Sequence, residues 1–240
     1  MSGQSIGDQQ NVMASEPEES SDRAAALGIQ GAGRSIVVAL IAADGSHKHA
    51  IMARLTAQQL PVRDIADAVH ALCLLHGRQP GIIDHALARN SQPAAQAWLE
   101  VAVEGFAVER ALLAKLASAA GPLPSTPGQA ESEAAVASQR HALDMLAQSD
   151  RTGCAIGAAV ALVSDWAAMR QIMEAAARRF GIEPPAYALP LAAETETIVA
   201  QVAENPAVER AMAFGVQQVL AQHRGLWDLL EARTSARDRQ

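Results

Sequence analysis

Two segments of the chain, one hundred residues apart, contain the same five-residue string, Ala-Val-Glu-Arg-Ala, at 107–111 and 207–211. Both strings lie in long segments rich in Ala, Leu and Val. Apolar residues recur there every three or four positions, which is typical of helices that bury one face. Two helices of one design predict two duplicated helical hairpins, packed on each other in an all-α helical bundle. In that arrangement Glu109 and Glu209 would face a shared axis.

The composition agrees with helix packing on helix. Half of the 240 residues are hydrophobic but only 3% are aromatic, so the core has to be built mainly from Ala, Leu, Val, Ile and Met. Alanine is the strongest helix former and lets helices approach closely. The formal net charge of −7 repels phosphate backbones, so we expect no nucleic-acid partner.

The chain shows neither a secretory signal pattern nor a long apolar run. The longest early run, 36–43, is far too short to cross a bilayer. The two cysteines, Cys73 and Cys154, both stand in apolar helical contexts. This predicts small buried thiols rather than a disulfide framework. We therefore expect a soluble, cytoplasmic protein with no membrane association.

Three regions differ in composition. Residues 1–33 are polar and aperiodic, which predicts a disordered N-terminal arm. Residues 34–233 form the predicted helical bundle domain, and 234–240 a flexible C-terminal tail. The segment 35–41 is β-branched enough for a strand, but no partner strand is evident elsewhere, so a short buried helix is favoured.

Proline, glycine and capping residues delimit the expected helices. The segment 121–128, with three prolines in six residues, is the clearest linker because proline cannot continue a helix. Gly105, in the long helix that carries the first string, would permit a close crossing. The expected helices span 62–76, 80–89, 93–120, 130–148, 152–180 and 192–233, the last with a kink at Asn205-Pro206.

The two repeated strings also determine which kind of metal site they could build. They read Glu109-Arg110-Ala111-Leu112 and Glu209-Arg210-Ala211-Met212. Over about residues 60–232 the duplicated hairpins resemble the ferritin-like superfamily of four-helix bundles, whose di-metal sites use Glu-x-x-His motifs. Here an apolar residue stands at both histidine positions, so the resemblance implies the architecture and only an atypical ligand set. In its alanine-rich style the chain also resembles uncharacterised helical bundles of high-GC bacteria.

Glu109 and Glu209 lie at the edges of apolar helix faces. A carboxylate in that position is either paired with a cation or shifted in pKa. Adjacent residues do not face each other on one helix, so an ion pair would cross between helices to Arg110, Arg170 or Arg210. The other reading is that both glutamates are metal ligands.

The histidines cluster early in the chain. Asp67 and His70 stand one helical turn apart, a geometry that can share a divalent ion, and Asp84-His85 follows on the next short helix. His76 suits the last turn of its helix without any further function, and His47 and His49 read as exposed loop residues. The candidate metal ligands are therefore Asp67, His70, Asp84, His85, Glu109, Glu209 and His223.

No nucleotide-binding or hydrolase motif is present, and no catalytic residue or cofactor is indicated. The leading expectation is a non-enzymatic binding or scaffold module for a protein partner or a small apolar ligand. Apolar stripes on more than one helix face also favour a homodimer. The alternative is a ferritin-like metal-binding protein or metal-dependent oxidoreductase that uses the candidate ligands.

Overall fold

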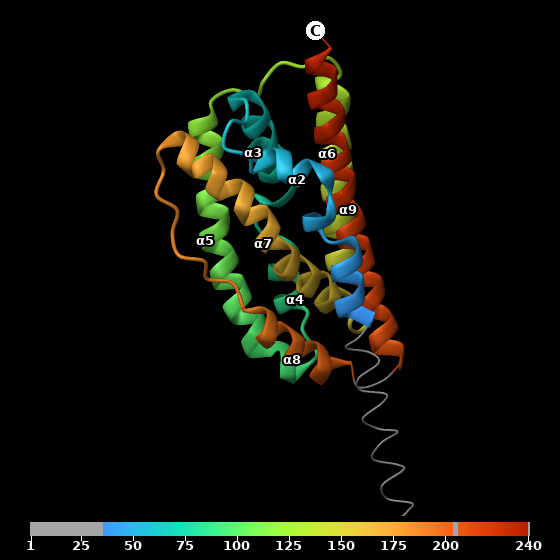
Figure 1. Cartoon of the computed structure of the whole chain (residues 1–240). Helices are drawn as coiled ribbons and strands as arrows, with labels where there is room; N and C mark the ends of the chain where they lie inside the picture. Colours follow the sequence, from blue (N-terminus) through green and yellow to red (C-terminus); the bar gives the residue numbers. More distant parts are fainter. Residues whose placement is uncertain (1–35, 204–205, 240) are drawn as a thin grey trace, which may run out of the picture.

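The computed structural model describes residues 36–203 and 206–239, and every regular element in these ranges is helical (Figure 1). The prediction of an all-α bundle is thereby confirmed. The arm predicted to be disordered, 1–33, lies outside the described residues. Within the described ranges, no helix combines the length and the apolar composition needed to cross a membrane.

The helices begin and end close to the boundaries that proline and glycine predict. The segment 36–44 is helical, as favoured over a strand, but only Val37 in it is buried. The expected helix 192–233 is two helices, one ending at Val202 and one beginning at Pro206; Asn205, where the kink was expected, lies outside the described residues. The elements that follow 36–44 are η1 (Ser46–Lys48), α2 (Ala50–Leu55), α3 (Val62–His76), α4 (Ile82–Ala88), η2 (Pro93–Ala95), α5 (Gln96–Ala120), α6 (Gln129–Ala147), α7 (Cys154–Phe180), α8 (Ala192–Val202) and α9 (Pro206–Asp238).

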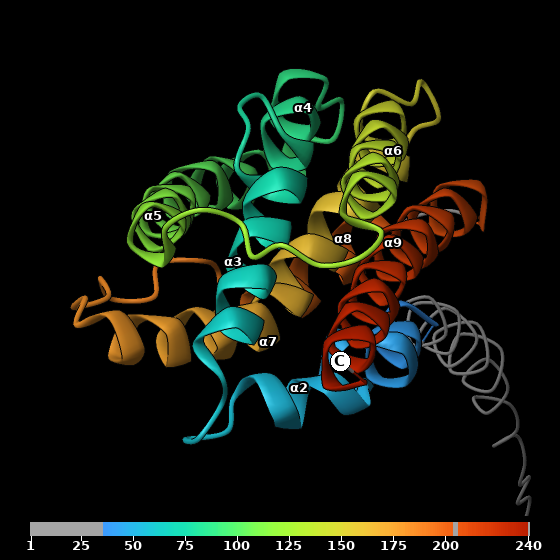
Figure 2. The same ribbon diagram turned by 90° about the horizontal axis from the view of Figure 1, so that it is seen from above.

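α7 is the central helix of the molecule. It contacts each of the other α-helices from α2 to α9, and the view from above shows it crossing the middle of the structure (Figure 2). Its residues are buried on nearly every side, including Val160, Trp166, Met169 and Met173. A helix whose residues are buried on nearly every side belongs in the core. The helices α2 to α6, α8 and α9 all pack against α7.

α7 and α9 are in close contact because glycine stands on both helices where they cross. A Cβ atom at Gly157 would overlap the backbone of Met212, and one at Gly215 would overlap the backbone oxygen of Cys154. Backbone offers no flexible side chain that could move aside, so a larger residue at either position would push the two helices apart.

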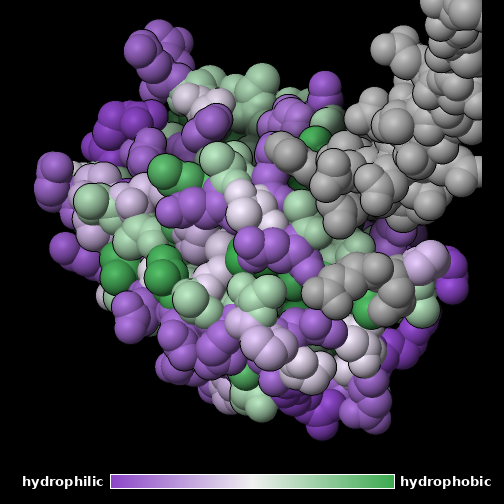
Figure 3. All heavy atoms as spheres, turned by 90° about the horizontal axis from the view of Figure 1, so that it is seen from below, coloured by the Kyte–Doolittle hydropathy of each residue, from purple (hydrophilic) through white to green (hydrophobic). Residues whose placement is uncertain are grey.

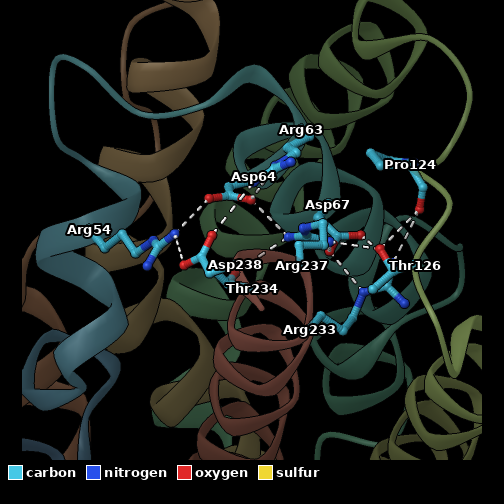
Figure 4. A network of polar contacts seen from close by, with 10 residues as sticks. All are labelled: Arg54, Arg63, Asp64, Asp67, Pro124, Thr126, Arg233, Thr234, Arg237 and Asp238. Carbon is cyan, nitrogen blue, oxygen red and sulfur yellow. Dashed lines mark hydrogen bonds and ion pairs between the residues drawn. The ribbon is translucent and has the colours of Figure 1, made fainter. Parts of the chain in front are cut away.

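The C-terminal end of α9 is held by a group of buried charges, which we call the α9 charge cluster (Figure 4). Arg233 donates to both carboxylate oxygens of Asp67 at 2.8 Å. Arg237 donates to Asp67 at 2.6 Å and to Asp64 at 2.9 Å. Both arginines also contact the hydroxyl of Thr126, in the linker between α5 and α6. The cluster ties α9 to α3 and to that linker.

The flexible tail predicted for 234–240 is wrong for the described residues of that segment. α9 continues to Asp238, and Thr234 and Arg237 are only 3% and 7% exposed. The carboxylates of Asp64 and Asp67 are buried on α3, and a buried carboxylate needs a cation close by. The last turns of α9 supply that cation.

The two repeated strings do not occupy equivalent places. In α5, Glu109 contacts α7 at Trp166 and Arg170. In α9, Val208 lies against Gly153, just before α7 begins. At the rise of an α-helix, these two points on α7 are about 20 Å apart. The expectation that Glu109 and Glu209 would face a shared axis is therefore wrong, because the first string packs on the middle of α7 and the second packs beside the N-terminal end of α7.

Candidate functional site

A chain of buried polar groups connects η1, α7, α9 and α3, and we call it the histidine relay. Asp165 on α7 accepts hydrogen bonds from the backbone N–H and the hydroxyl of Ser46. Its Oδ2 lies 2.7 Å from Nδ1 of His223, and Nε2 of His223 lies 3.0 Å from Nε2 of His76. Trp227 donates to the Ser46 hydroxyl at 2.7 Å. None of these side chains is more than 6% exposed.

The geometry restricts where the protons of the histidine relay can lie. With Asp165 ionised, His223 donates to it from Nδ1, and one proton lies between the Nε2 atoms of His223 and His76. Burial lowers the pKa of His76 well below its usual value, and His223 and Arg110 lower it further. Burial acts to raise the pKa of Asp165, but hydrogen bonds from His223 and Ser46 outweigh it and lower that pKa. The relay thus favours an ionised Asp165 and a neutral His76.

The cavity described beside the histidine relay is too small for a substrate. The cavity beside His76, which Arg78, Phe106 and Arg140 also line, has a volume of about 20 Å³. This is the space of roughly one water molecule. The relay can hold and orient protons inside the core, but only a water-sized molecule could reach His76 through this cavity.

A far larger opening lies on the other side of the same elements, and we call it the apolar groove. Its volume is about 460 Å³, within the range of small-molecule sites. It lies between the helical segment 36–44, the middle of α7, and α8 with the residues just before it. Its lining residues are Val37, Val38, Ile41, Ala42, His47, Val160, Val163, Ser164, Ala167, Tyr187, Pro190, Leu191, Ala192, Thr195, Glu196 and Val199.

The apolar groove and the histidine relay are built from adjacent residues of the same two chain segments. Ser46 and Asp165 belong to the relay, whereas their sequence neighbours His47 and Ser164 line the groove. At the end of the molecule that carries α8, hydrophobic residues gather in patches among hydrophilic ones (Figure 3). The most exposed large apolar residue of the groove is Leu191, at 65%.

One wall of the apolar groove is the segment 181–191 between α7 and α8, which an arginine fixes in place. Arg170 donates from Nη2 to the backbone oxygen of Pro185 and lies 5.8 Å from the ring centre of Tyr187. Gly105 lets this segment pass close to α5, since a Cβ there would overlap the backbone of Ala188. The close crossing predicted at Gly105 is therefore present, but its partner is a loop rather than a helix.

Arg170 is also one half of a buried ion pair with Glu109. The two carboxylate oxygens of Glu109 accept from Nη1 of Arg170 and, at 3.0 Å, from Nε1 of Trp166. Glu109 is fully buried. Burial raises the pKa of Tyr187 to about 12, with a further contribution from the negative charge of Glu109. Of the two readings of Glu109, the structure shows the ion pair between helices.

Residues 41–238 match the model of DUF6975, a family of unknown function. The chain belongs to the DUF6975 family. No curated protein and no solved structure matches it. The part of the chain shared with the DUF6975 family includes the histidine relay and most of the lining of the apolar groove. It also reaches Asp238, so it contains the α9 charge cluster.

In this DUF6975 protein two further candidate carboxylates, Asp67 and Asp84, are bound by arginine as Glu109 is. Asp67 belongs to the α9 charge cluster, and Asp84 receives both a bidentate contact from Arg110 and the N–H of Gly81. His70 contacts the backbone oxygen of Gly121 at 2.8 Å. His85 and Glu209 are partly buried. His223 belongs to the histidine relay, where its partners are Asp165 and His76.

Metal binding at the seven candidate ligands stays a prediction. Within the described ranges, three potential metal ligands with atoms within 4.8 Å of one another are found elsewhere. They are His49, Asp228 and Glu231, none of which is among the seven candidates. The sequence predicts an exposed loop position for His49. The ring is partly buried instead, with Nδ1 accepting from the N–H of Ile51 at 3.3 Å and Nε2 3.0 Å from Asp228.

Sequence reasoning missed four members of the histidine relay, namely Ser46, Asp165, Trp227 and His76, the last of which was given only a role at the end of its helix. One signal was available, because Asp165 is a lone acid in the long apolar run 154–169 of α7. A carboxylate at such a position has to be satisfied inside the core. No signal placed Ser46 opposite it, since the two residues are 119 positions apart.

Proposed function

We propose that this protein is a non-enzymatic binding module that takes a small apolar ligand in the apolar groove. The observation that carries the proposal is the groove itself, which combines ample volume with a mainly aliphatic lining and a few polar groups. Concave sites of this composition are typical of small-molecule binding. The cavity described beside the histidine relay is too small for a substrate, which supports a structural role for the relay.

The proposal is tested by titration with Nile red, an uncharged dye whose fluorescence increases in apolar surroundings. Ala167 is exposed on α7 within the groove, so Ala167→Phe fills the groove without entering the core. Ala137, exposed on α6 outside the groove, gives the matched control Ala137→Phe. We expect the fluorescence increase to be lost in Ala167→Phe and kept in Ala137→Phe. Equal binding by both variants would place the dye elsewhere and refute the proposal.

A second candidate function is metal binding at His49, Asp228 and Glu231. An imidazole with two carboxylates is a donor set suited to a divalent transition metal. However, the N–H of Ile51 points at Nδ1 of His49, which places the ring proton on Nε2, where a metal would have to bind. Elemental analysis of untagged protein and of His49→Ala tests this candidate. Equal metal content in the two samples would exclude it.

Self-association is a separate proposal. Val101 and Val108 are exposed on α5, two turns apart on one face, and a second copy of the chain would cover them. Sedimentation equilibrium at micromolar concentration would show a dimer. The variant Val108→Glu should then sediment as a monomer, and a monomeric wild type would refute the proposal.

A further inference from the structure

The charges of the apolar groove restrict the ligand it can hold. Among its described lining residues, the groups that can be charged are His47 and Glu196, and no lysine or arginine is present. Burying the carboxylate of a fatty acid needs a cation as partner. The described lining residues offer no permanent cation.

The nearest buried guanidinium does not supply this cation. Arg170 lies behind the ring of Tyr187, not in the lining, and Glu109 already neutralises its charge. Its remaining contacts are with the backbone oxygen of Pro185 and with Glu174, one turn further along α7. An anionic head group in the groove would therefore meet no available positive charge from this arginine.

Two hydroxyl groups of the lining are available instead. Neither the Ser164 hydroxyl nor the Tyr187 hydroxyl has a hydrogen-bond partner among the residues that the structure describes. Thr195, in contrast, already donates to the backbone oxygen of Leu191 and accepts from Trp98. Because its pKa is raised to about 12, Tyr187 stays an uncharged phenol that can donate and accept.

We infer that the ligand of the apolar groove is a neutral single-chain amphiphile, an aliphatic chain with a hydroxyl or carbonyl head that Ser164 and Tyr187 bind. The aliphatic lining takes the chain and the two hydroxyls take the head. This inference rests on the proposed function, since it names the chemical class of ligand for the same groove.

The test is displacement of Nile red by 1-decanol and by decanoate, two ligands with the same chain length, at pH 8. At pH 8 decanoate is fully ionised, whereas a free imidazole in water is neutral and carries no positive charge that could pair with it. We expect 1-decanol to displace the dye at a concentration at least about tenfold lower than decanoate, because the carboxylate would be desolvated without a partner. Ser164→Ala and Tyr187→Phe should each weaken 1-decanol binding about fivefold, the effect of one lost hydrogen bond.

The matched control is Ser138→Ala, at an exposed serine of α6, which should leave 1-decanol binding unchanged. Tyr187→Phe keeps the ring beside Arg170, so its circular dichroism and thermal midpoint should match the wild type. Decanoate binding as tightly as 1-decanol, or 1-decanol binding that neither hydroxyl affects, would overturn the ligand class and leave the binding module standing. Absence of Nile red binding would refute the proposed function itself.

Discussion

The buried ion pair between Glu109 and Arg170 predicts a large and specific loss of stability in Glu109→Gln. The substitution keeps the shape and the acceptor for Trp166 but removes the charge. Among the described residues, Arg170, 5% exposed, then keeps Glu174 as its ionic partner, at 3.2 Å and with the Glu174 side chain 42% exposed. Removing one partner of a buried pair costs about 3–5 kcal/mol, and the remaining contact with Glu174 favours the lower end, about 3 kcal/mol.

The repeated string provides the control for this experiment. Glu209 has the same four neighbours in sequence, but it lies in the first turn of α9, where it is only partly buried. Its charge interacts favourably with the helix dipole, which contributes about 0.3–1 kcal/mol. We therefore expect Glu209→Gln to reduce the free energy of unfolding by less than about 1 kcal/mol.

Urea unfolding followed by circular dichroism measures both variants. At about 2–4 °C per kcal/mol for a chain of this size, Glu109→Gln should also lower the thermal midpoint by about 6–12 °C. The double variant Glu109→Gln with Arg170→Met should be more stable than Glu109→Gln alone, because no unpaired charge remains buried. Equal losses in Glu109→Gln and Glu209→Gln would refute the reasoning, since the two positions would then have equivalent environments.

Three further predictions concern the core. The pKa of His76 is lowered in the folded state, so the unfolded chain binds more protons below about pH 6.5. The free energy of unfolding should therefore fall by about 1.4 kcal/mol for each pH unit below that value. A urea midpoint that stays constant from pH 7.5 to 5.5 would contradict this prediction. Gly215→Ala should cost about 1–3 kcal/mol in thermal unfolding. Gly225→Ala, where a Cβ meets only the side chain of Gln139, should be neutral or stabilising by up to about 1 kcal/mol; similar effects at both glycines would argue against the close crossing. Deleting 234–240 should destabilise the protein by about 3 kcal/mol through loss of Arg237, whereas an unchanged thermal midpoint would mean that these residues are dispensable.

The local elements of the fold were predictable from the sequence. Pro61 and Gly77 bracket α3 as expected, and the proline-rich segment after Gly121 separates α5 from α6. Capping and breaking residues act within a few positions of themselves, so one sequence contains the information. The assembly of the helices was predicted less well. A repeated five-residue string suggested two equivalent hairpins, but equal local sequence does not determine which partner a helix packs against.

The buried polar groups show the same limit. That Glu109 would pair with an arginine from another helix followed from helix geometry, and Arg170 was among the named partners. The α9 charge cluster and the histidine relay join residues more than one hundred positions apart, such as Asp67 with Arg233. No periodicity connects such positions, and the apolar groove is equally a product of three distant segments.

Because each of the helices α2 to α9 packs against α7, the helices before α7 in the chain depend on it to complete their core. A cut in the segment 121–128 would divide the chain into α2–α5 on one side and α6–α9 on the other. The first fragment would lose the helix that covers its inner face. We expect the cleaved halves either to remain bound to each other or to unfold together, in one cooperative transition rather than as separable lobes.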